Sequence, residues 1–441
     1  MTRPVIPSPE YRRRRKQLMR MMGKDSIALL SAAPERIRNR DSHYAYRQDS
    51  DFAYLTGLDE PEAVLALVPG RKPAEVVLFL RSRDPDRERW DGERLGPERA
   101  PESLLVDDAF PIEDIDDILP GLIEGRSRVF YHFGRDPGFD QHVLQWLERI
   151  RAQVKQGARP PHEFVDLGHS LHDLRLFKSR AELQVMRESA RIAGLAHRAT
   201  MRAIRPGLNE ADLQAEFEYV LRKHQAVNAY EPIVGAGPNA CVLHYRSNRS
   251  PIRDGDLLLL DGGAEYQWYA SDITRTYPAN GRFSAPQREI YELVLAAQHA
   301  AIREARPGRP FTAMHEAAVR TLAKGLLELG LLSGSLREVL NEHRYRRFYM
   351  HKTGHWLGLD VHDVGDYRVH DQPRLLEPGM VLTIEPGLYF AADDATIPDA
   401  YRGIGVRIED DVLITKGEPE ILTADVPKTV AEIEHWMAGL A

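Results

Sequence analysis

The sequence predicts an α/β N-terminal domain followed by an α+β domain that is built from two similar halves. Between residues 26 and 150, short apolar runs of strand length alternate with helical patterns, which is typical of an α/β domain. Further along the chain, one motif occurs twice: a glycine, five mostly apolar residues and then an acid. The two copies run from Gly255 to Asp261 and from Gly379 to Glu385. They indicate an internal duplication with a pseudo-twofold axis.

The N-terminal domain begins with a basic run, RRRR, shortly after Ser8 and Pro9. These two residues are typical of a helix start, so we expect a helix whose arginines face solvent. The segments SIALLSA, AVLALV, EVVLFL and RVFYH are expected to form strands, and the residues around Val143 to Ile150 a helix. We find no pattern of metal ligands in this domain.

A change of composition between Gly157 and Lys178, beginning with GARPPHEF, marks the domain boundary. We therefore expect an N-terminal domain at residues 1–173 and a C-terminal domain at residues 174–441. In the second domain, Ser179 and Glu182 form a capping-box signature for a long helix. Later helices are expected to begin at Asn209, at Ser284 and near the C-terminus. Each duplicated motif follows a helical pattern closed by RxxRPG, at residues 202–207 and 303–308.

Composition excludes several classes of function. Of the 441 residues, 43% are hydrophobic and 28% are charged, as in ordinary globular proteins. The net charge of -7 provides no basic surface for nucleic acid or anionic membranes. The lone Cys241 excludes an intrachain disulfide and a thiolate metal site, and it fits the reducing cytoplasm. No signal peptide and no membrane-spanning run are expected.

Ionisable residues within or directly after apolar, strand-like runs indicate a metal site, because an uncompensated buried charge costs several kcal/mol or more. The candidate ligands are four acids and one histidine: Asp261, Asp272, His355, Glu385 and Glu409. A set so rich in oxygen suits divalent ions such as Mn²⁺, Co²⁺ or Zn²⁺. Two such ions can activate a shared water and polarise a carbonyl group, so the pattern predicts metal-assisted hydrolysis.

Each candidate has an alternative interpretation. Asp261 could be a turn residue before two glycines. Glu409, Asp410 and Asp411 could form a solvated strand edge, and residue alternation alone does not choose between Glu409 and Asp411. The segment HKTGH resembles the helical zinc-protease motif but lacks its glutamate and contains a glycine, so we reject that interpretation. His244 and His362 could be hydrogen-bonded core histidines.

Four segments carry a resemblance to a known family: DGGAEYQWYASDITRT, HWLGLDVHD, TIEPGLY and RIEDD. They hold the five candidate ligands in an order that resembles the pita-bread metallopeptidases. The segments YRQDSDFAYLTGLDEPEAVLALV and ERWDGERLG extend the resemblance into the N-terminal domain, where it is similar to the Xaa-Pro aminopeptidase (aminopeptidase P) family. Lys352 departs from the family pattern, which often has glycine there.

The resemblance implies a pita-bread catalytic domain with two metal ions, usually Mn²⁺, that removes the first residue of a peptide when proline follows it. It implies that Asp261 and Asp272 bind one ion and His355 the other, with Glu409 bridging the two ions alongside Asp272. Glu385 is expected to coordinate and to transfer a proton.

Further roles follow from the same resemblance. His351 and His362 are expected to stabilise the oxyanion and position the substrate, and His244 to line the cleft. Tyr389 and Arg407 are expected to orient these groups or relay protons. Trp90 and Arg159 match family positions that close the substrate cleft, and Trp90 could equally be an ordinary interface or core aromatic.

The family's usual state implies a homo-oligomer, a tetramer or a dimer, to which the N-terminal domain contributes. One alternative function is a prolidase that cleaves only Xaa-Pro dipeptides. Another is a non-catalytic pita-bread protein that binds peptides, although such a protein would be expected to have lost ligands.

Overall fold

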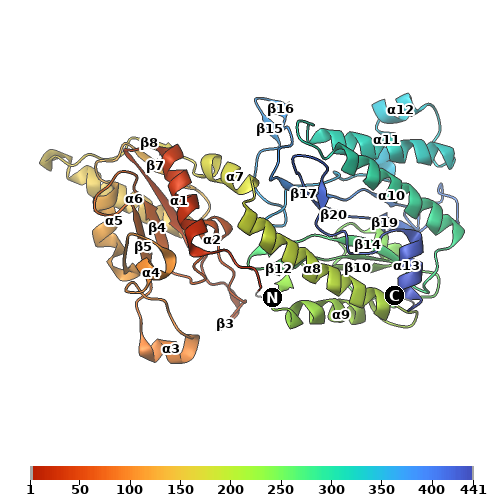
Figure 1. Cartoon of the computed structure of the whole chain (residues 1–441), viewed down its shortest axis with the longest axis horizontal. Coiled ribbons are helices and arrows are strands. Elements are labelled where there is room, and N and C mark those ends of the chain that lie inside the picture. Colours follow the sequence, from red (N-terminus) through yellow and green to blue (C-terminus); the bar gives the residue numbers. More distant parts are fainter. Residues whose placement is uncertain (1–2, 440–441) are drawn as a thin grey trace. The chain divides into compact units, whose positions relative to one another are not determined.

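The computed structural model describes residues 3–439, and the chain divides into two compact units (Figure 1). The first unit spans Ile6–Arg175. The second begins at Leu176 and also includes residues 3–5. The structural division thus falls at residues 175 and 176, whereas the sequence analysis placed it at residues 173 and 174.

The N-terminal unit is organised around a six-stranded mixed sheet with the strand order β6-β5-β4-β1-β7-β8. The strands are β1 (Ser26–Ser31), β4 (Val64–Leu67), β5 (Val76–Leu80), β6 (Asp108–Pro111), β7 (Arg128–Phe130) and β8 (Glu163–Val165). Strand β4 runs antiparallel to both of its neighbours, β1 and β5, whereas β7 lies parallel to both β1 and β8. The central strands β1, β4 and β5 are buried almost throughout, which explains their continuous apolar runs.

Helices cover this sheet, and a short hairpin extends from it. The helices are α1 (Ser8–Met22), α2 (Ser50–Thr56), α3 (Pro85–Asp91), α4 (Ala100–Leu104), α5 (Ile115–Ile123), α6 (Pro137–Ala152) and α7 (Gly168–Leu176). The hairpin is formed by β2 (Ile37–Asn39) and β3 (Ser42–His43). Apolar side chains of α5 and α6, among them Leu122, Trp146 and Ile150, pack with side chains of β1, β4 and β5 in one core.

The basic run of α1 corrects one expectation. Arg12 and Arg13 are exposed, but Arg14 and Arg15 are buried, so the prediction that all four arginines face solvent is wrong. The Arg14 guanidinium donates to the carbonyl oxygen of Tyr54 at 3.0 Å, and that of Arg15 donates to the carbonyl oxygen of Leu55 at 2.7 Å. The charge pattern could not reveal this, because both acceptors are backbone atoms at the end of another helix.

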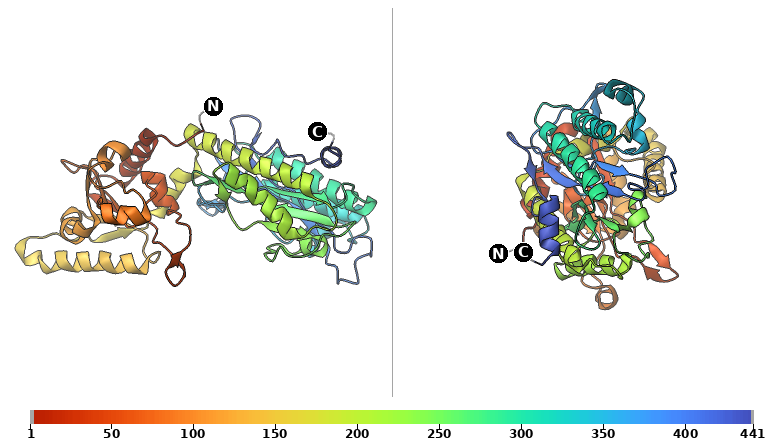
Figure 2. Two further views of the ribbon diagram at one scale, coloured as in Figure 1. Left: turned by 90° about the horizontal axis from the view of Figure 1, so that it is seen from below. Right: turned by 90° about the vertical axis from the view of Figure 1, so that its right-hand side faces the viewer.

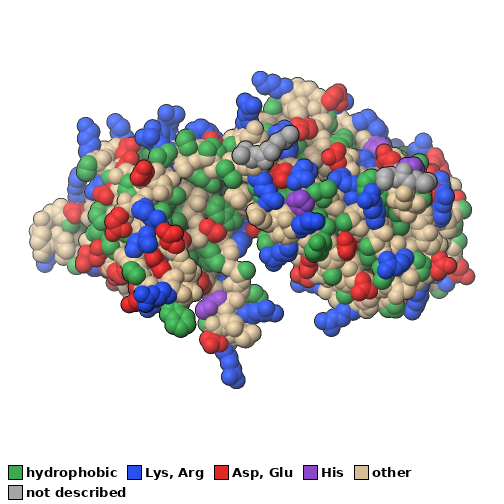
Figure 3. All heavy atoms as spheres, turned by 60° about the horizontal axis from the view of Figure 1, so that its bottom comes forward, with side chains coloured by type: hydrophobic (Ala, Val, Ile, Leu, Met, Phe, Trp, Pro, Cys, Tyr) green, Lys and Arg blue, Asp and Glu red, His purple; other side chains and the backbone are tan. Residues whose placement is uncertain are grey.

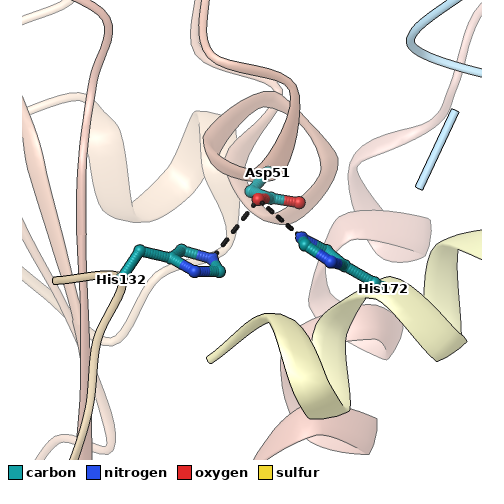
Figure 4. A group of neighbouring side chains, drawn as sticks. All are labelled: Asp51, His132 and His172. Atoms are coloured by element: carbon teal, nitrogen blue, oxygen red, sulfur yellow. Dashed lines mark hydrogen bonds and ion pairs between the residues drawn. The ribbon is translucent and has the colours of Figure 1, made fainter. Parts of the chain in front are cut away.

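Asp51 on α2 is the centre of a buried ion-pair network in this unit. Its Oδ1 accepts a hydrogen bond from Arg175 at 2.7 Å, and its Oδ2 accepts one from Arg135 at 2.8 Å. The Nε2 atoms of His132 and His172 lie 3.4 and 3.3 Å from the same Oδ2 (Figure 4). Through these contacts, Asp51 holds α7 and the loop after β7 against α2.

The same three side chains, Asp51, His132 and His172, have the spacing of a metal site, which the sequence analysis did not find in this domain. Electrostatics argues against a cation here, because the guanidinium groups of Arg135 and Arg175 already compensate the carboxylate. Burial by itself would raise the pKa of Asp51, but the ion pair with Arg175 outweighs it and holds the pKa well below its usual range. The cluster is therefore a structural ion-pair network.

The C-terminal unit contains five longer helices and one short one among its described residues. These are α8 (Arg180–Ala203), α9 (Glu210–Lys223), α10 (Ala285–Glu304), α11 (Thr312–Glu328), α12 (Leu336–Asn341) and α13 (Val430–Met437). Capping boxes begin α8 at Ser179, α9 at Asn209 and α10 at Ser284, as predicted from the sequence. In the RxxRPG motifs, the first arginines, Arg202 and Arg303, lie one residue before the ends of α8 and α10.

The strands of this unit form several small sheets. They are β9 (Val227–Asn228), β10 (Ile233–Ala236), β11 (Leu257–Asp261), β12 (Ala264–Tyr266), β13 (Tyr269–Ala270), β14 (Thr274–Pro278), β15 (Arg368–Val369), β16 (Gln372–Pro373), β17 (Val381–Ile384), β18 (Gly387–Tyr389), β19 (Gly405–Arg407), β20 (Asp410–Leu413) and β21 (Glu420–Ile421). The sheet of the first half has the order β10-β11-β14, and that of the second half has the order β17-β20-β21.

The two halves have matching architecture. Each has a pair of packed helices, α8 with α9 and α10 with α11, and each pair is followed by strands that it covers. In Figure 1 the strands lie between these two pairs, and the left view of Figure 2 looks onto α8 and α9. The duplicated motifs occupy equivalent places, since β11 ends at Asp261 and Glu385 directly follows β17. The expected duplication is thus present in the fold.

Acidic and basic side chains are intermixed on the face of each unit that Figure 3 shows. Among residues 3–439, no helix is both long enough and apolar enough to cross a membrane.

The Asp51 network generates a first prediction. Replacing Asp51 with Asn removes the charge but keeps the size of the side chain. It removes the ion pair of the buried Arg175 with Asp51 and one of the two ion pairs of Arg135, which keeps Asp49. We expect a loss of about 3–5 kcal/mol in the free energy of unfolding of the N-terminal unit at neutral pH, measured by urea denaturation. Asp86→Asn is the control, because Asp86 and its partner Arg89 are 88% and 78% exposed, and it should leave the unfolding midpoint unchanged.

The pH dependence of this difference has a definite sign. Because folding lowers the pKa of Asp51, its ionised form stabilises the folded unit above the unfolded pKa of about 3.9. The difference in the free energy of unfolding between wild type and Asp51→Asn should therefore have its full size at neutral pH. It should become smaller as the pH falls below about 3.9. A gap that stays constant down to pH 3 would contradict the assigned ion pairs.

Candidate metal centre

The five predicted ligands come together from both halves of the C-terminal unit. They line one cavity of about 1100 Å³. Asp261 ends β11, Asp272 lies in the turn before β14, Glu385 follows β17 and Glu409 lies between β19 and β20. Asp261, Asp272 and Glu409 are only 8%, 5% and 2% exposed, so the cavity has acidic groups at its most buried part.

The ligand atoms are close enough to share an ion. One ligand atom each of Asp272, His355 and Glu409 lie within 4.8 Å of one another. The Nε2 atom of His355 is 3.5 Å from Oδ2 of Asp272 and 3.9 Å from Oε1 of Glu385. Glu409 is oriented by the Thr274 hydroxyl, which donates to its Oε2 at 2.7 Å.

The His355 ring is fixed in the tautomer that a metal ligand needs. Its Nδ1 lies 2.9 Å from the carbonyl oxygen of Trp356. A carbonyl oxygen can only accept, so Nδ1 carries a hydrogen, and Nε2 is the ring nitrogen that faces the acids and is free to bind a metal ion when it is deprotonated. Such a backbone contact to the second ring nitrogen is typical of metal-binding histidines.

The acids are short of positive charge. Burial raises the pKa of Glu409 well above its usual range, and Asp272 adds to this by repulsion. Burial likewise raises the pKa of Glu385 to about 7. For His355, burial acts to lower the pKa, but Asp272 outweighs it and raises the pKa to about 9. Among the residues that the structure describes at this site, only Arg407 and a protonated His355 offset the four negative charges, so the site fits divalent cations.

Tyr230 was not found by the sequence analysis. Its hydroxyl oxygen lies 2.5 Å from Oδ1 of both Asp261 and Asp272. A hydroxyl carries one hydrogen and can donate to only one acid at a time. One of the two acids therefore has an oxygen close to the Tyr230 oxygen without a hydrogen from it. This crowding of oxygen atoms is a second sign that the site lacks positive charge. Tyr230 precedes β10 without an acidic or apolar pattern around it, so no sequence signal pointed to it.

A hydrogen-bonded chain leads from the acids along the cavity wall. Arg407 donates to Asp261 Oδ2 at 2.6 Å and to the Tyr389 hydroxyl oxygen at 3.0 Å. The Tyr389 oxygen lies 2.9 Å from Nε2 of His351, and Nδ1 of His351 lies 2.7 Å from the carbonyl oxygen of Lys352. Because that carbonyl can only accept, Nδ1 carries the hydrogen and Tyr389 donates to Nε2. Burial and Arg407 lower the pKa of His351 to about 3, so its ring is neutral.

The remaining predicted residues lie in two places. His244 and His362 line the same cavity and are exposed, so neither is a core histidine, and the His362 ring lies 4.3 Å from that of His355. Trp90 and Arg159 belong to the N-terminal unit, where Trp90 is 89% exposed and Arg159 is also exposed. Trp90 is thus not a core aromatic, and the part of both residues in closing the substrate cleft stays a prediction.

The structure also decides between the neighbouring acids of the RIEDD segment. Glu409 faces the cavity, while Asp411 lies behind the cluster and accepts a hydrogen bond from the backbone N–H of Asp272 at 3.2 Å. Asp410 pairs with Arg275 at 2.8 Å in the interior. All three acids are buried, so the alternative of a solvated strand edge is wrong.

A duplicated α+β domain with a buried cluster of four carboxylates and a histidine defines a metal-dependent hydrolase. Two family models match the chain: "Metallopeptidase family M24" over residues 184–416 and "Aminopeptidase P, N-terminal domain" over residues 11–131. The chain belongs to metallopeptidase family M24, among the Xaa-Pro aminopeptidases, and has their pita-bread fold.

The similarity to individual relatives extends over the whole chain. Xaa-Pro aminopeptidase of Escherichia coli is 45% identical over 436 residues, which is 98% of each chain. Among solved structures, aminopeptidase PepP of Pseudomonas aeruginosa is 57% identical with a TM-score of 0.98, covering 100% of this chain and 99% of that one. Aminopeptidase P of E. coli in complex with substrate is 45% identical with a TM-score of 0.96, covering 98% and 99%.

The geometry predicts different roles for two neighbouring histidines. Removal of a side chain that only supports a metal ligand usually lowers metal affinity ~10–100-fold. His355→Ala should lower the affinity for divalent metal at least as much, because it removes a ligand itself. His362→Ala is the matched control, because its ring is adjacent but no hydrogen bond fixes it toward the acids, and it should keep the metal. Metal content per chain after dialysis, measured by mass spectrometry, checks both variants. Retention by His355→Ala together with loss by His362→Ala would reverse the assignment.

Proposed function

We propose that this metallopeptidase removes the N-terminal residue from peptides that have proline in the second position. The observation that carries the proposal is the buried cluster of Asp261, Asp272, His355, Glu385 and Glu409 at the most buried part of one cavity. The full-length similarity to Xaa-Pro aminopeptidases, which includes the N-terminal domain, supports the substrate class.

The five cluster residues would hold two divalent ions. Asp261 and Asp272 would hold one and His355 the other, with Glu409 shared between them alongside Asp272. Mn²⁺ is the proposed metal, with Co²⁺ or Zn²⁺ as alternatives. When bound, the ions lower the pKa of a water molecule and polarise the scissile carbonyl group.

Glu385 would transfer the proton. It lies 3.9 Å from His355 and 3.8 Å from His351, on the wall where both the attacking water and the leaving nitrogen have to fit. In hydrolysis, the water oxygen bonds to the carbonyl carbon, the C–N bond breaks and the proline nitrogen receives a proton. Glu385 can accept this proton from the water and give it to the nitrogen.

The groups beside Glu385 would hold the substrate. The hydrogen bonds from Asp261 through Arg407 and Tyr389 to His351 fix these side chains in place. They would lie beside the carbonyl oxygen of the scissile bond. His351 would donate to that oxygen from the ring nitrogen that carries its hydrogen, which requires its contacts with Tyr389 and Lys352 to rearrange when the peptide binds. His362 and His244 would line the path of the peptide, and Trp90 and Arg159 would close it from the N-terminal unit.

The cavity also suits proline itself. Proline makes the scissile amide tertiary and removes its N–H, so recognition cannot use that donor. The cavity offers apolar side chains for the ring, including Ile233, Leu243, Met314 and Val361. The acidic cluster also attracts the free ammonium group of the first residue, as an aminopeptidase requires.

Two alternatives give way to this proposal. A non-catalytic peptide-binding protein would not need to bury uncompensated acids. A prolidase would share the metal site but would act only on dipeptides. We further propose that the protein works in the cytoplasm as a homo-oligomer, a tetramer or a dimer.

Substrate length separates the proposed function from prolidase activity. With added Mn²⁺, the enzyme should release alanine from Ala-Pro-Ala faster than from Ala-Pro, and it should leave Ala-Ala-Ala nearly intact. Chromatography of the products checks this. Cleavage of the dipeptide alone would assign the protein to the prolidases.

The proposed role of His351 predicts a loss of rate without a loss of metal. His351→Ala should keep its divalent ions, because His351 is not among the proposed ligands, while kcat falls by roughly 10²–10³-fold, the usual effect of removing one oxyanion donor. His435→Ala, an exposed histidine on α13, is the control and should match wild type. Steady-state kinetics and metal analysis of both variants decide the question, and an unchanged kcat in His351→Ala would refute the role.

A further inference from the structure

The charged side chains that line the cavity are arranged by sign. Three acids of the cluster are buried and Glu385 is half-buried, while three basic residues, Arg246, Lys352 and Arg368, line the same cavity and are exposed. Apart from the cluster, Glu231 is the only acid among the lining residues that the structure describes. The inner part of the cavity therefore has four acids against the buried Arg407, and its solvent side has three bases against Glu231, which is also exposed.

The three basic residues come from separate segments of the chain. Arg246 lies in the loop before β11, Lys352 lies between His351 and Thr353, and Arg368 begins β15. Within residues 3–439, no carboxylate forms an ion pair with any of the three. Arg368 donates to the carbonyl oxygen of Asp371, which leaves its charge uncompensated.

Lys352 lies next to a residue of the cavity wall in the chain, Thr353. His315 on α11 lines the cavity, and its Nδ1 lies 2.8 Å from the Thr353 hydroxyl oxygen. Burial lowers the pKa of His315 to about 4, and the positive charge of Lys352 adds to the decrease. Lys352 and His315 thus line the same cavity, and the charge of Lys352 disfavours a second positive charge on that wall.

A bound peptide would lie along this gradient of charge. On the proposed function, its ammonium end is at the acidic cluster, and its chain runs outward from the scissile bond. An extended chain spans about 3.3–3.6 Å per residue, so the carboxylate of a tripeptide falls about 10 Å from its ammonium group. A cavity of about 1100 Å³ has room for a ligand of this length.

We infer that Arg246, Lys352 and Arg368 form a cationic rim that recognises a carboxylate group downstream of the scissile bond. The inference rests on the proposed aminopeptidase function and names the substrates that this site prefers. The carboxylate is either the free C-terminus of a short peptide or an acidic side chain that follows the proline. The three positive charges of the rim complement the negative charge of this carboxylate.

The test compares peptides that differ only in this charge. For wild type at low salt, kcat/KM for Ala-Pro-Ala with a free C-terminus should exceed that for Ala-Pro-Ala amide by roughly 5–20-fold, and 0.5 M NaCl should reduce the ratio. Ala-Pro-Glu amide separates the two sources of the carboxylate. If it is cleaved as fast as the free acid, the rim accepts side chains, and if it matches the Ala-Pro-Ala amide, the rim requires the C-terminus.

A triple variant, Arg246→Gln, Lys352→Gln and Arg368→Gln, should bring the acid-to-amide ratio close to one while keeping the rate on the amide. The side-chain changes leave the Lys352 carbonyl oxygen in place for His351. Lys324→Gln is the matched control, because Lys324 is 68% exposed and pairs with Glu328 on α11, away from the cavity lining.

The outcomes separate the two proposals. Equal rates on the acid and the amide in wild type, or an unchanged ratio in the triple variant, would overturn the rim and leave the aminopeptidase function intact. Cleavage of neither peptide would overturn the proposed function and the rim with it.

Discussion

Burying several negative charges in one place costs more free energy than any single contact around them returns, and the C-terminal unit is arranged to make this possible. Four carboxylates meet where the strands of the two halves end. Arg407 compensates Asp261, the Tyr230 hydroxyl contacts Asp261 and Asp272, and the Thr274 hydroxyl orients Glu409. The charge that these contacts leave uncompensated is what makes the cluster a site for divalent cations.

The same constraint extends into the structure behind the cluster. The backbone N–H of Glu409 donates to the carbonyl oxygen of Thr274 at 3.0 Å, which joins the second half of the unit to the first. Arg275 then donates to the carbonyl oxygen of Glu409 at 2.5 Å and pairs with Asp410, to which Lys428 also donates at 2.6 Å. A ligand held in this way cannot move without breaking buried ion pairs, so the metal centre is preorganised.

The charge of the side chains that line the cavity differs between its buried part and its solvent side. Negative groups lie at its most buried part, apolar side chains cover part of its wall and basic groups lie at its solvent side. A peptide has the complementary polarity, with an ammonium group at one end and a carboxylate at the other. On the proposed function, this polarity orients a peptide with its first peptide bond toward the cluster.

The sequence by itself determined the features that depend on local pattern. Repetition of the motif ending in Asp261 and Glu385 revealed the duplicated fold, because equivalent strands need equivalent apolar runs. Capping residues such as Ser179 and Ser284 fixed where helices begin, because capping uses only neighbouring backbone groups.

Tertiary structure alone decided the choice between Glu409 and Asp411, the contact of Tyr230 with two acids, and the burial of Arg14 and Arg15. It also placed Lys352 on the solvent side of the cavity. The deciding partners of the acids, of Tyr230 and of the two arginines are backbone groups, hydroxyls or acids that are distant in the sequence. Side-chain alternation and charge patterns contain no information about which distant groups packing brings together.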